Sequence, residues 1–350
     1  MAQATVEEVE ATPPRRAGDI VVPVIGFALL GLAALWLIVE FVGQPSQFTE
    51  YTLAGLNNGA LYALIALGYT LVYGIIELIN FSHGDLFMLS TVVSGIVAVT
   101  LLGAASTISV GSIVAVFVAL VVAMFAAAAV NTTAERVAYR RLRRAPKLAP
   151  LITAVGLSFI YQWLGQQSWM SGSAPKNWPS LLRNRSFEVG NVTVPWGTVI
   201  VIAVTIPLLL GLTYIVQSTR QGKAMRATAQ DQDAARLMGI DVDRTIAFTF
   251  ALGGAMAGAA GLLWLESVAT TRYDAGFKLG LIAFTAAVLG GIGNLNGAVL
   301  GGFLIGLIEA WNDGLGLGPN WSNSVVFTIL IALMVFRPEG ILGNATTEKV

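Results

Sequence analysis

The sequence has no cysteine and a single histidine, His83. The absence of cysteine excludes disulfides, a thiolate nucleophile and cysteine-ligated metal sites. Charged residues are also scarce, at 11% of the 350 residues, whereas soluble domains carry about 25%. Hydrophobic residues make up 55% and the formal net charge is zero. This composition excludes a soluble enzyme, a disordered chain and a nucleic-acid-binding protein with a basic face.

Long uncharged stretches are what the sequence has instead. About 20 apolar residues in a helix span the ~30 Å hydrocarbon core of a bilayer. The block 86–134 has a polar break at 103–109, and the block 279–308 has glycines at 290–294, so each is expected to form two segments. The second pair is either two tilted spans or a re-entrant pair. The uncharged blocks are 20–39, 51–76, 86–134, 148–175, 189–219, 245–265, 279–308 and 314–336. The sequence therefore predicts an all-α polytopic membrane protein with about ten membrane segments.

The basic residues set the orientation. Lys and Arg stay on the cytoplasmic side of a membrane, and 15 of the 20 fall in the cytoplasmic segments if both termini are inside. We therefore expect cytoplasmic tails at 1–19 and 343–350. The apolar stretch 20–42 is longer than the ~7–15 residues of a signal peptide, so it is expected to be a retained transmembrane helix.

Small and acidic residues within the spans have plain structural interpretations. Glycines four residues apart, at 254/258, 297/301 and 302/306, are typical of closely packed membrane helices. Five acidic residues lie near predicted span ends and are expected to be solvated helix ends: Glu40, Glu77, Asp85, Glu266 and Glu309. Because no ladder of carboxylates runs through the helices, a proton- or sodium-coupled mechanism is disfavoured.

Motifs for catalysis are missing. The chain has no Gly-x-x-x-x-Gly-Lys-[Ser/Thr] loop, since Gly222-Lys223 is followed by Ala224 and lacks the upstream glycine. It also has no cluster of metal ligands and no triad around His83. We therefore predict no catalytic residue, no metal and no cofactor. If the chain is a transporter, it must either use energy that a partner protein supplies or transport its substrate passively.

Three stretches carry unusual patterns. In 57–85 an apolar helix ends in the polar run Asn80-Phe-Ser-His-Gly-Asp85, whose side chains either cap the flanking helices or meet a substrate. In 217–244 a helix is predicted over Lys223–Met238, ending at Gly239. In 284–311 a Gly- and Asn-rich break divides two short apolar halves, which in many carriers marks the transport pathway.

The predicted helix over Lys223–Met238 has two interpretations. It either lies on the membrane surface or docks in a partner's groove. The alanines that would form its smooth docking face are Ala227, Ala229, Ala234 and Ala235.

Five motifs in register resemble the inner-membrane permeases of branched-chain amino acid ABC importers, specifically the H-type subunit. The resemblance covers residues 51–342, so the helix at 20–42 is an addition to it. The motifs are Tyr62–Gly74 (YALIALGYTLVYG), Ile79–Gly84 (INFSHG), Ala149–Ser158 (APLITAVGLS), Gly222–Asp231 (GKAMRATAQD) and Phe284–Asn294 (FTAAVLGGIGN).

The resemblance implies an ABC importer permease fold in the bacterial inner membrane. It implies pairing with an M-type permease subunit, two cytoplasmic P-loop ATPases and an extracytoplasmic solute-binding protein that delivers a small-molecule substrate. No nucleic-acid partner is expected. The outer surfaces of the helices are expected to contact membrane lipid. Within the cytoplasmic loop 217–244, the residues expected to couple the permease to the ATPase are Lys223, Arg226, Ala227, Ala229, Asp231, Ala235 and Gly239.

The translocation pathway is expected to be lined by polar groups, which suit a zwitterionic substrate. The candidates are Asn57, Asn58, Tyr62, Asn80, His83, Gly293, Asn294 and Asn296. Three alternatives stay open at this point.

The first alternative is another substrate, since the same architecture imports urea, amides or other amino acids. The second is a passive channel or secondary carrier, which the loop 217–244 and the missing ion-coupling residues disfavour. The third is a membrane scaffold, which is disfavoured because the break at 290–297 would then have no function.

Overall fold

The computed structural model describes residues 31–32, 34–102, 109–143, 145–146, 148–180 and 185–343. The chain divides into two units, Met1–Thr49 and Glu50–Val350. In the first unit, an apolar helix over Ala34–Gly43 overlaps the stretch 20–42 predicted to be a membrane helix. The rest of that stretch up to residue 30, the tail 1–19 and the tail from 344 onward lie outside the described residues.

Nearly all of the second unit is helical. Its helices are α2 (Pro45–Ile76, which begins in the first unit), α3 (Ser82–Leu102), α4 (Val110–Ala134), α5 (Arg140–Leu142), α6 (Leu148–Gln166), α7 (Trp196–Ser218), α8 (Arg220–Gln230), α9 (Gln232–Leu237), α10 (Val242–Val268), α11 (Ala275–Gly290), α12 (Leu295–Leu315) and α13 (Ser322–Phe336). A π-helical turn at Glu135–Tyr139 joins α4 to α5, and a 3-10 turn at Pro319–Trp321 precedes α13.

Four short strands complete the second unit. Strand β1 (Lys176–Asn177) pairs antiparallel with β4 (Thr270–Thr271), with Lys176 opposite Thr271. Strands β2 (Ser186–Val189) and β3 (Val192–Pro195) form a hairpin in which Phe187 lies opposite Val194.

The helices confirm the predicted fold class. Within the described residues, eight helices are long and apolar enough to cross a membrane, and the total of ten is reached only with two shorter ones, Ala34–Gly43 and α11. The block 86–134 does form two helices, α3 and α4, although residues 103–108 between them lie outside the described part. The block 279–308 also divides as expected, into α11 and α12.

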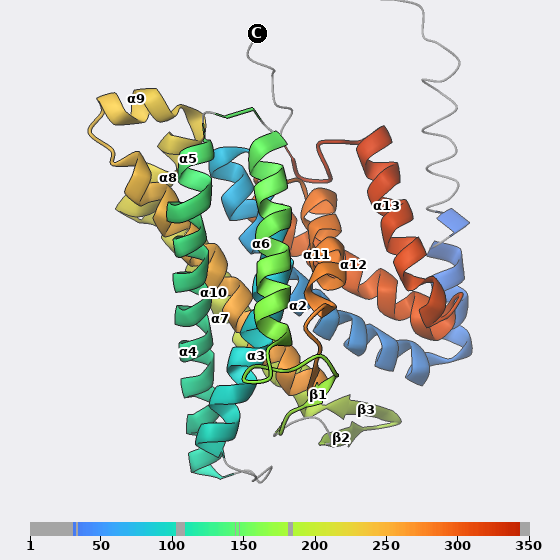
Figure 1. The fold of residues 1–350 in the computed structure, drawn as a ribbon. Helices are drawn as coiled ribbons and strands as arrows, with labels where there is room; N and C mark the ends of the chain where they lie inside the picture. The colour runs from blue at the N-terminus through green and yellow to red at the C-terminus, as the bar shows by residue number, and fades with distance from the viewer. Residues whose placement is uncertain are drawn as a thin grey trace, which may run out of the picture. The chain divides into compact units, whose positions relative to one another are not determined.

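The two ends of the second unit differ in character. Helices α5, α8 and α9 lie at one end, at the top of Figure 1, whereas strands β1 to β3 lie at the opposite end. The described basic residues of 136–143 and 220–244 are therefore at the same end, which the positive-inside pattern assigns to the cytoplasm.

Small residues let the central helices approach closely. Helix α10 packs against α4 and α3, and a Cβ added at Gly254 or Gly258 of α10 would lie 2.5 Å from the carbonyl oxygen of Ala127 or Ala123. Gly302 of α12 comes equally close to α2, since its Cβ would lie 2.6 Å from Ala63 Cα. The packing interpretation of the paired glycines is thus confirmed for these helices.

Candidate functional site

Asn80 caps the start of α3. It is buried, and its side-chain oxygen accepts hydrogen bonds from the backbone N–H of Ser82 (3.2 Å), from Ser82 Oγ (2.6 Å) and from the hydroxyl of Tyr139 (2.7 Å). The last bond ties the turn before α3 to the π-helical turn after α4. These contacts favour the capping role of the polar run 80–85, and a pathway role for Asn80 stays a prediction.

His83 lies in the interior of the helix bundle. It is 1% exposed, and its ring packs edge-on against Tyr69 of α2, with ring centroids 5.0 Å apart. Gly68 leaves the space that the imidazole fills, because any Cβ at that position would collide with it. The structure therefore gives His83 a packing role at the α2–α3 contact, and its place in the pathway is untested.

Two of the acidic residues expected at solvated helix ends are buried instead. Asp85 is 0% exposed and accepts hydrogen bonds from Ser158 Oγ and from Gln162 Nε2 (3.2 Å), both on α6. Glu266 is 2% exposed and accepts from Ser180 Oγ at 3.1 Å. The solvated-end prediction is wrong for both, because neighbouring segments that the sequence does not reveal cover these positions.

The predicted pathway residues of α2 lie around one polar pair. The Tyr62 hydroxyl donates to a carboxylate oxygen of Glu309 on α12 at 2.5 Å. Asn57 and Asn58, just over a turn earlier on α2, are half-buried and joined by a 3.4 Å contact from Asn57 Nδ2 to Asn58 Oδ1. Glu309 is partly buried and lies beside this polar group. Its position near a predicted span end gave no sign of this contact, and the place of these residues in a pathway stays a prediction.

The break between α11 and α12 is confirmed and has a clear local cause. Gly291 and Gly293 have φ angles of 104° and 95°, which residues other than glycine rarely adopt. Asn294 then caps α12 by accepting from the Gly297 N–H at 3.1 Å, and its Nδ2 donates to the Leu342 carbonyl at 2.8 Å. Gly293 and Asn296 are exposed. The break lies against the residues that follow α13, as the bond from Asn294 to Leu342 shows, whereas Tyr62 contacts the other half of α12 at Glu309.

The cytoplasmic loop 217–244 contains two helices, not the single helix predicted over Lys223–Met238. Helix α8 ends at Gln230 and α9 begins at Gln232, because Asp231 between them is extended (φ −158°). Its carboxylate accepts from the N–H groups of Asp233 (2.8 Å) and Ala234 (2.9 Å), which caps α9. Gly239 has a φ of 82° just after α9, as expected for a residue that ends a helix.

The exposed face of this loop differs from the predicted alanine face. Ala235 is 3% exposed and Ala227 is half-buried, so Ala235 packs inward and does not lie on an outer docking surface. The large exposed apolar side chains are Leu237 (89%) and Met238 (82%). Their signal in the sequence was two adjacent large apolar residues at the end of an otherwise polar helix. The remaining predicted coupling residues are exposed: Lys223, Arg226, Ala229, Asp231 and Gly239.

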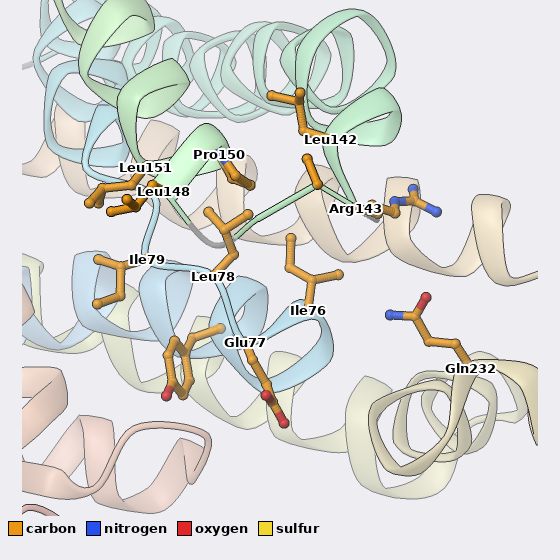
Figure 2. Close-up of a pocket in the computed structure, with 12 residues that line it drawn as sticks. Ile76, Glu77, Leu78, Ile79, Leu142, Arg143, Leu148, Pro150, Leu151 and Gln232 are labelled. Carbon is orange, nitrogen blue, oxygen red and sulfur yellow. The ribbon is translucent and has the colours of Figure 1, made fainter.

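A pocket of about 550 Å³ lies between the end of α2, the start of α6 and the first turn of α9 (Figure 2). Its polar lining includes Glu77, Arg143 and Gln232, and its other walls are largely apolar. No expectation from the sequence located this pocket, because its walls come from four separate segments. Within the described ranges, no group of three or more His, Cys, Asp or Glu side chains is placed to hold a metal ion.

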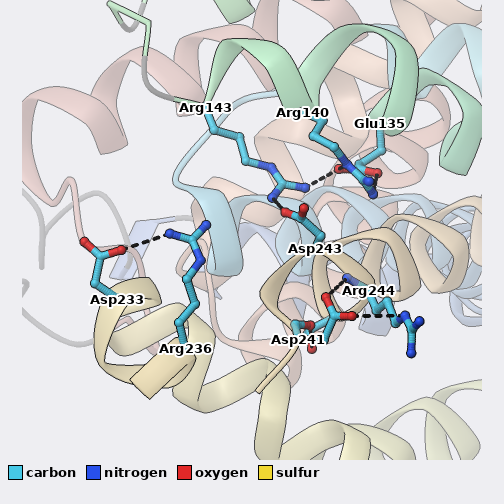
Figure 3. Close-up of polar contacts among 9 residues, drawn as sticks. Glu135, Arg140, Arg143, Asp233, Arg236, Asp241, Asp243 and Arg244 are labelled. Carbon is cyan, nitrogen blue, oxygen red and sulfur yellow. Dashed lines mark hydrogen bonds and ion pairs between the residues drawn. The ribbon is translucent and has the colours of Figure 1, made fainter. Parts of the chain in front are cut away.

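An ion-pair network connects the end of α4 to the start of α10 (Figure 3). Glu135 is 0% exposed and pairs with Arg140 at 3.0 Å and with Arg143. Arg143 also pairs with Asp243 in the first turn of α10 at 2.6 Å. Because α10 begins at Val242, within the loop 217–244, this network ties the end of that loop to the π-helical turn after α4.

Replacing Glu135 by Gln is expected to destabilise the protein strongly. It leaves the nearly buried Arg143 with one partner fewer, and breaking a buried ion pair typically costs about 3–5 kcal/mol. Asp233→Asn is the matched control, since it breaks only an exposed pair with Arg236 (2.9 Å), a class of pair worth about 0–1 kcal/mol. Thermal unfolding in detergent measures both; equal midpoints for the two variants would contradict a stabilising network.

Comparison with known proteins places this arrangement in one family. Residues 51–335 match the profile of the family described as branched-chain amino acid transport system, permease component. The chain is 38% identical to the high-affinity branched-chain amino acid transport system permease protein BraD of Pseudomonas aeruginosa, over 87% of this chain and 98% of BraD. It is also 38% identical to LivH of Escherichia coli, a permease of the same description, over 88% of this chain and 99% of LivH.

A more distant relative has a different described role. The chain is 23% identical to the autoinducer 2 import system permease protein LsrC of Photorhabdus laumondii, over 92% of this chain and 91% of LsrC. The profile match and the two 38% identical relatives span most of the sequence. This chain belongs to the family of branched-chain amino acid transport system permease components, which are multi-pass inner-membrane transport subunits and not enzymes.

Proposed function

We propose that this chain forms the membrane pore of an ATP-driven importer of branched-chain amino acids. The observation that carries the proposal is the 38% identity to BraD and LivH over 98% and 99% of their lengths. A binding protein outside the membrane delivers the substrate, and partner ATPases supply the energy, since this sequence has no phosphate-binding loop of its own.

The partner assembly consists of an M-type permease and two P-loop ATPases. Exposed apolar side chains on α4 and α6 support burial against lipid and a second permease, among them Phe117 (64%), Phe125 (73%) and Phe159 (65%). At the cytoplasmic end, Leu237 and Met238 form the apolar part of the ATPase contact, flanked by exposed charged residues of α8 and α9. A short helix in a groove is a common mode of recognition.

Coupling works by moving the loop 217–244 between two positions. Closure of the ATPase pair on ATP displaces α8 and α9, and α10 follows directly after them. Through Asp243 and Arg143 the same movement reaches the end of α4. The two positions correspond to outward and inward access, and ATP shifts the equilibrium by binding one of them more tightly.

The pathway lies along the polar residues of α2, the turn before α3 and the α11–α12 break. Hydrogen-bonding groups in a wet path suit a zwitterion better than a row of fixed charges does. The residues assigned to it are Asn57, Asn58, Tyr62, Asn80, His83, Gly293, Asn294 and Asn296, with Glu309 beside Tyr62.

A substrate other than a branched-chain amino acid is the alternative to this proposal. LsrC shares 23% identity along most of its length and is described as a permease for autoinducer 2, so related architecture is found with other substrates. Urea, amides and other amino acids are alternatives of the same kind.

Affinity purification of the chain from its native membranes in mild detergent tests the partner assignment. Mass spectrometry is expected to find two ATPases with phosphate-binding loops, a second hydrophobic permease and a binding protein. Recovery of this chain as a homo-oligomer without any ATPase, in a detergent that preserves known ABC complexes, would favour a channel or carrier.

A further inference from the structure

Another pocket, of about 260 Å³, lies between the cytoplasmic ends of α4 and α10. Both helices are long and apolar enough to cross a membrane. The pocket is therefore at the level where the hydrocarbon core meets the cytoplasmic headgroups. Its lining residues are Thr132 and Arg136 from the end of α4 and the turn after it, and Arg244, Ala247, Phe248 and Ala251 from the start of α10.

The lining changes from charged to apolar along α10. Arg136 and Arg244 are exposed and bring two guanidinium groups to the cytoplasmic end. Ala247 and Ala251 lie one turn apart further along α10, with Phe248 between them, and they form an apolar surface of low relief. A phospholipid has the same order of groups, because its phosphate is an anion that arginine binds well and hydrocarbon chains follow.

The two guanidinium groups have donors to spare. Among the described residues, Arg136 forms no ion pair or side-chain hydrogen bond, since the neighbouring Glu135 is paired with Arg140 and Arg143. The Arg244 side chain is 89% exposed and pairs with Asp241 through its Nε at 3.0 Å (Figure 3). Its two terminal nitrogens bind no described residue, so a phosphate can reach both arginines without breaking a buried ion pair.

The depth of the pocket favours a lipid over a soluble anion. Its apolar walls belong to helices that span the membrane, so a hydrocarbon chain reaches them from the bilayer without crossing water. A free phosphate would contact the arginines and leave these walls uncovered. The cytoplasmic leaflet is negatively charged through its anionic lipids, and basic pockets between membrane helices on this side bind their headgroups.

We propose that this pocket binds one anionic phospholipid of the cytoplasmic leaflet. Its phosphate lies between Arg136 and Arg244. The start of an acyl chain lies along Ala247, Phe248 and Ala251. The bound lipid connects the end of α4 to the start of α10, and no transported substrate takes part in it, so the inference goes beyond the proposed function.

Photo-cross-linking of the full complex tests the proposal. The complex is placed in phosphatidylcholine nanodiscs with a small, non-saturating share of phosphatidylglycerol that carries a photoactivatable group near its glycerol. Peptides from the end of α4 and the start of α10 are expected to carry the cross-linked lipid. Arg136→Gln and Arg244→Gln should each lower the yield about fivefold, as expected for one basic residue at the membrane surface. The double variant should lower it about 25-fold, since independent contributions multiply.

Arg272→Gln is the matched control. Arg272 is also exposed and pairs through its Nε with one aspartate, Asp274, at 2.8 Å. It follows β4, which pairs with β1 at the opposite end of the chain's second unit, so its replacement should leave the cross-linking unchanged. Arg136→Lys with Arg244→Lys keeps both charges and should retain most of the yield.

Competition with the unaltered complex separates a lipid from a free phosphate and does not depend on the folding of any variant. Excess unlabelled phosphatidylglycerol is expected to displace the labelled lipid. Soluble glycerophosphoglycerol, which has the headgroup without acyl chains, should not. Competition by the soluble headgroup as strong as that by the lipid would replace the lipid site with a phosphate site.

Three other results would overturn the lipid site. The first is the absence of cross-links on the peptides of α4 and α10, which would show that another subunit covers the pocket. The second is an equal yield with photoactivatable phosphatidylcholine, and the third is an unchanged yield in the double glutamine variant.

Discussion

Replacing Leu237 and Met238 together by aspartate is expected to abolish ATP-driven uptake while the permease stays folded. Both side chains are more than four-fifths exposed in this chain, so aspartate costs little in the isolated subunit. At a docked interface the same change buries two unpaired charges. Loss of a central apolar contact costs about 2 kcal/mol or more, which is roughly a 30-fold loss of ATPase affinity. The measurements are leucine uptake and stimulation of ATP hydrolysis.

Conservative exchanges give the matched control for this prediction. Leu237→Met with Met238→Leu keeps the apolar volume, and such swaps usually cost less than about 1.5 kcal/mol, so uptake should be largely retained. Ala235→Asp has a different expected result, since its position is 3% exposed and the buried charge destabilises the loop itself. Normal coupling in the double aspartate variant would move the ATPase contact away from the end of α9.

Gly258→Leu is expected to prevent correct assembly of the helix bundle. A Cβ at this position would lie 2.7 Å from Met124 Cα, a backbone atom of α4 that no side-chain movement can clear. Helices α4 and α10 must separate, and the alanines of α4 that face α10 then lose their contacts. Overpacking of a core costs about 1–3 kcal/mol, and we expect the upper end, with a large loss of monodisperse protein in size-exclusion chromatography.

Gly211→Leu is the control for that substitution. Gly211 also lies within a membrane helix, α7, but nothing is within 4 Å of an added Cβ there. A leucine at position 211 meets open space and should leave the yield and thermal midpoint nearly unchanged. Similar behaviour of the two variants would show that the close α4–α10 contact is not what holds these helices together.

Features coded by neighbouring residues were predictable from the sequence. The spans follow from uninterrupted apolar runs, and the break between α11 and α12 follows from Gly291 and Gly293, whose positive φ angles explain why glycine is needed there. The paired glycines predicted close helix contacts because small residues have few other uses in a membrane helix.

Features that depend on distant segments were not predictable in the same way. Asp85 and Glu266 were expected at solvated ends, but their partners Ser158 and Ser180 are 73 and 86 residues away in the chain. The position of an acidic residue relative to an uncharged run shows where it lies along its own helix. It does not show which other segments of the chain bury it. The pocket beside Glu77 was missed for the same reason.

In the loop 217–244 the helix predicted from the sequence differs from the helices in the structure for another reason. Its alanine content predicted a continuous helix, since alanine has the highest helix propensity, but Asp231 accepts two backbone N–H bonds as a cap and divides it. Asp, Ser and Asn compete with the helix in this way. In the divided segment Leu237 and Met238 are exposed and Ala235 is buried, so the predicted alanine face is wrong at Ala235, and the coupling role of the loop stays a prediction.

Leucine uptake by the purified native complex in proteoliposomes tests whether this chain belongs to an ATP-driven importer of branched-chain amino acids. With the binding protein and labelled leucine outside and ATP inside, leucine uptake is expected, and it should stop when ATP is replaced by a non-hydrolysable analogue. Labelled urea in place of leucine should not accumulate. Leucine movement that is independent of ATP, or accumulation of urea but not of leucine, would contradict the assignment of this chain to ATP-driven import of branched-chain amino acids.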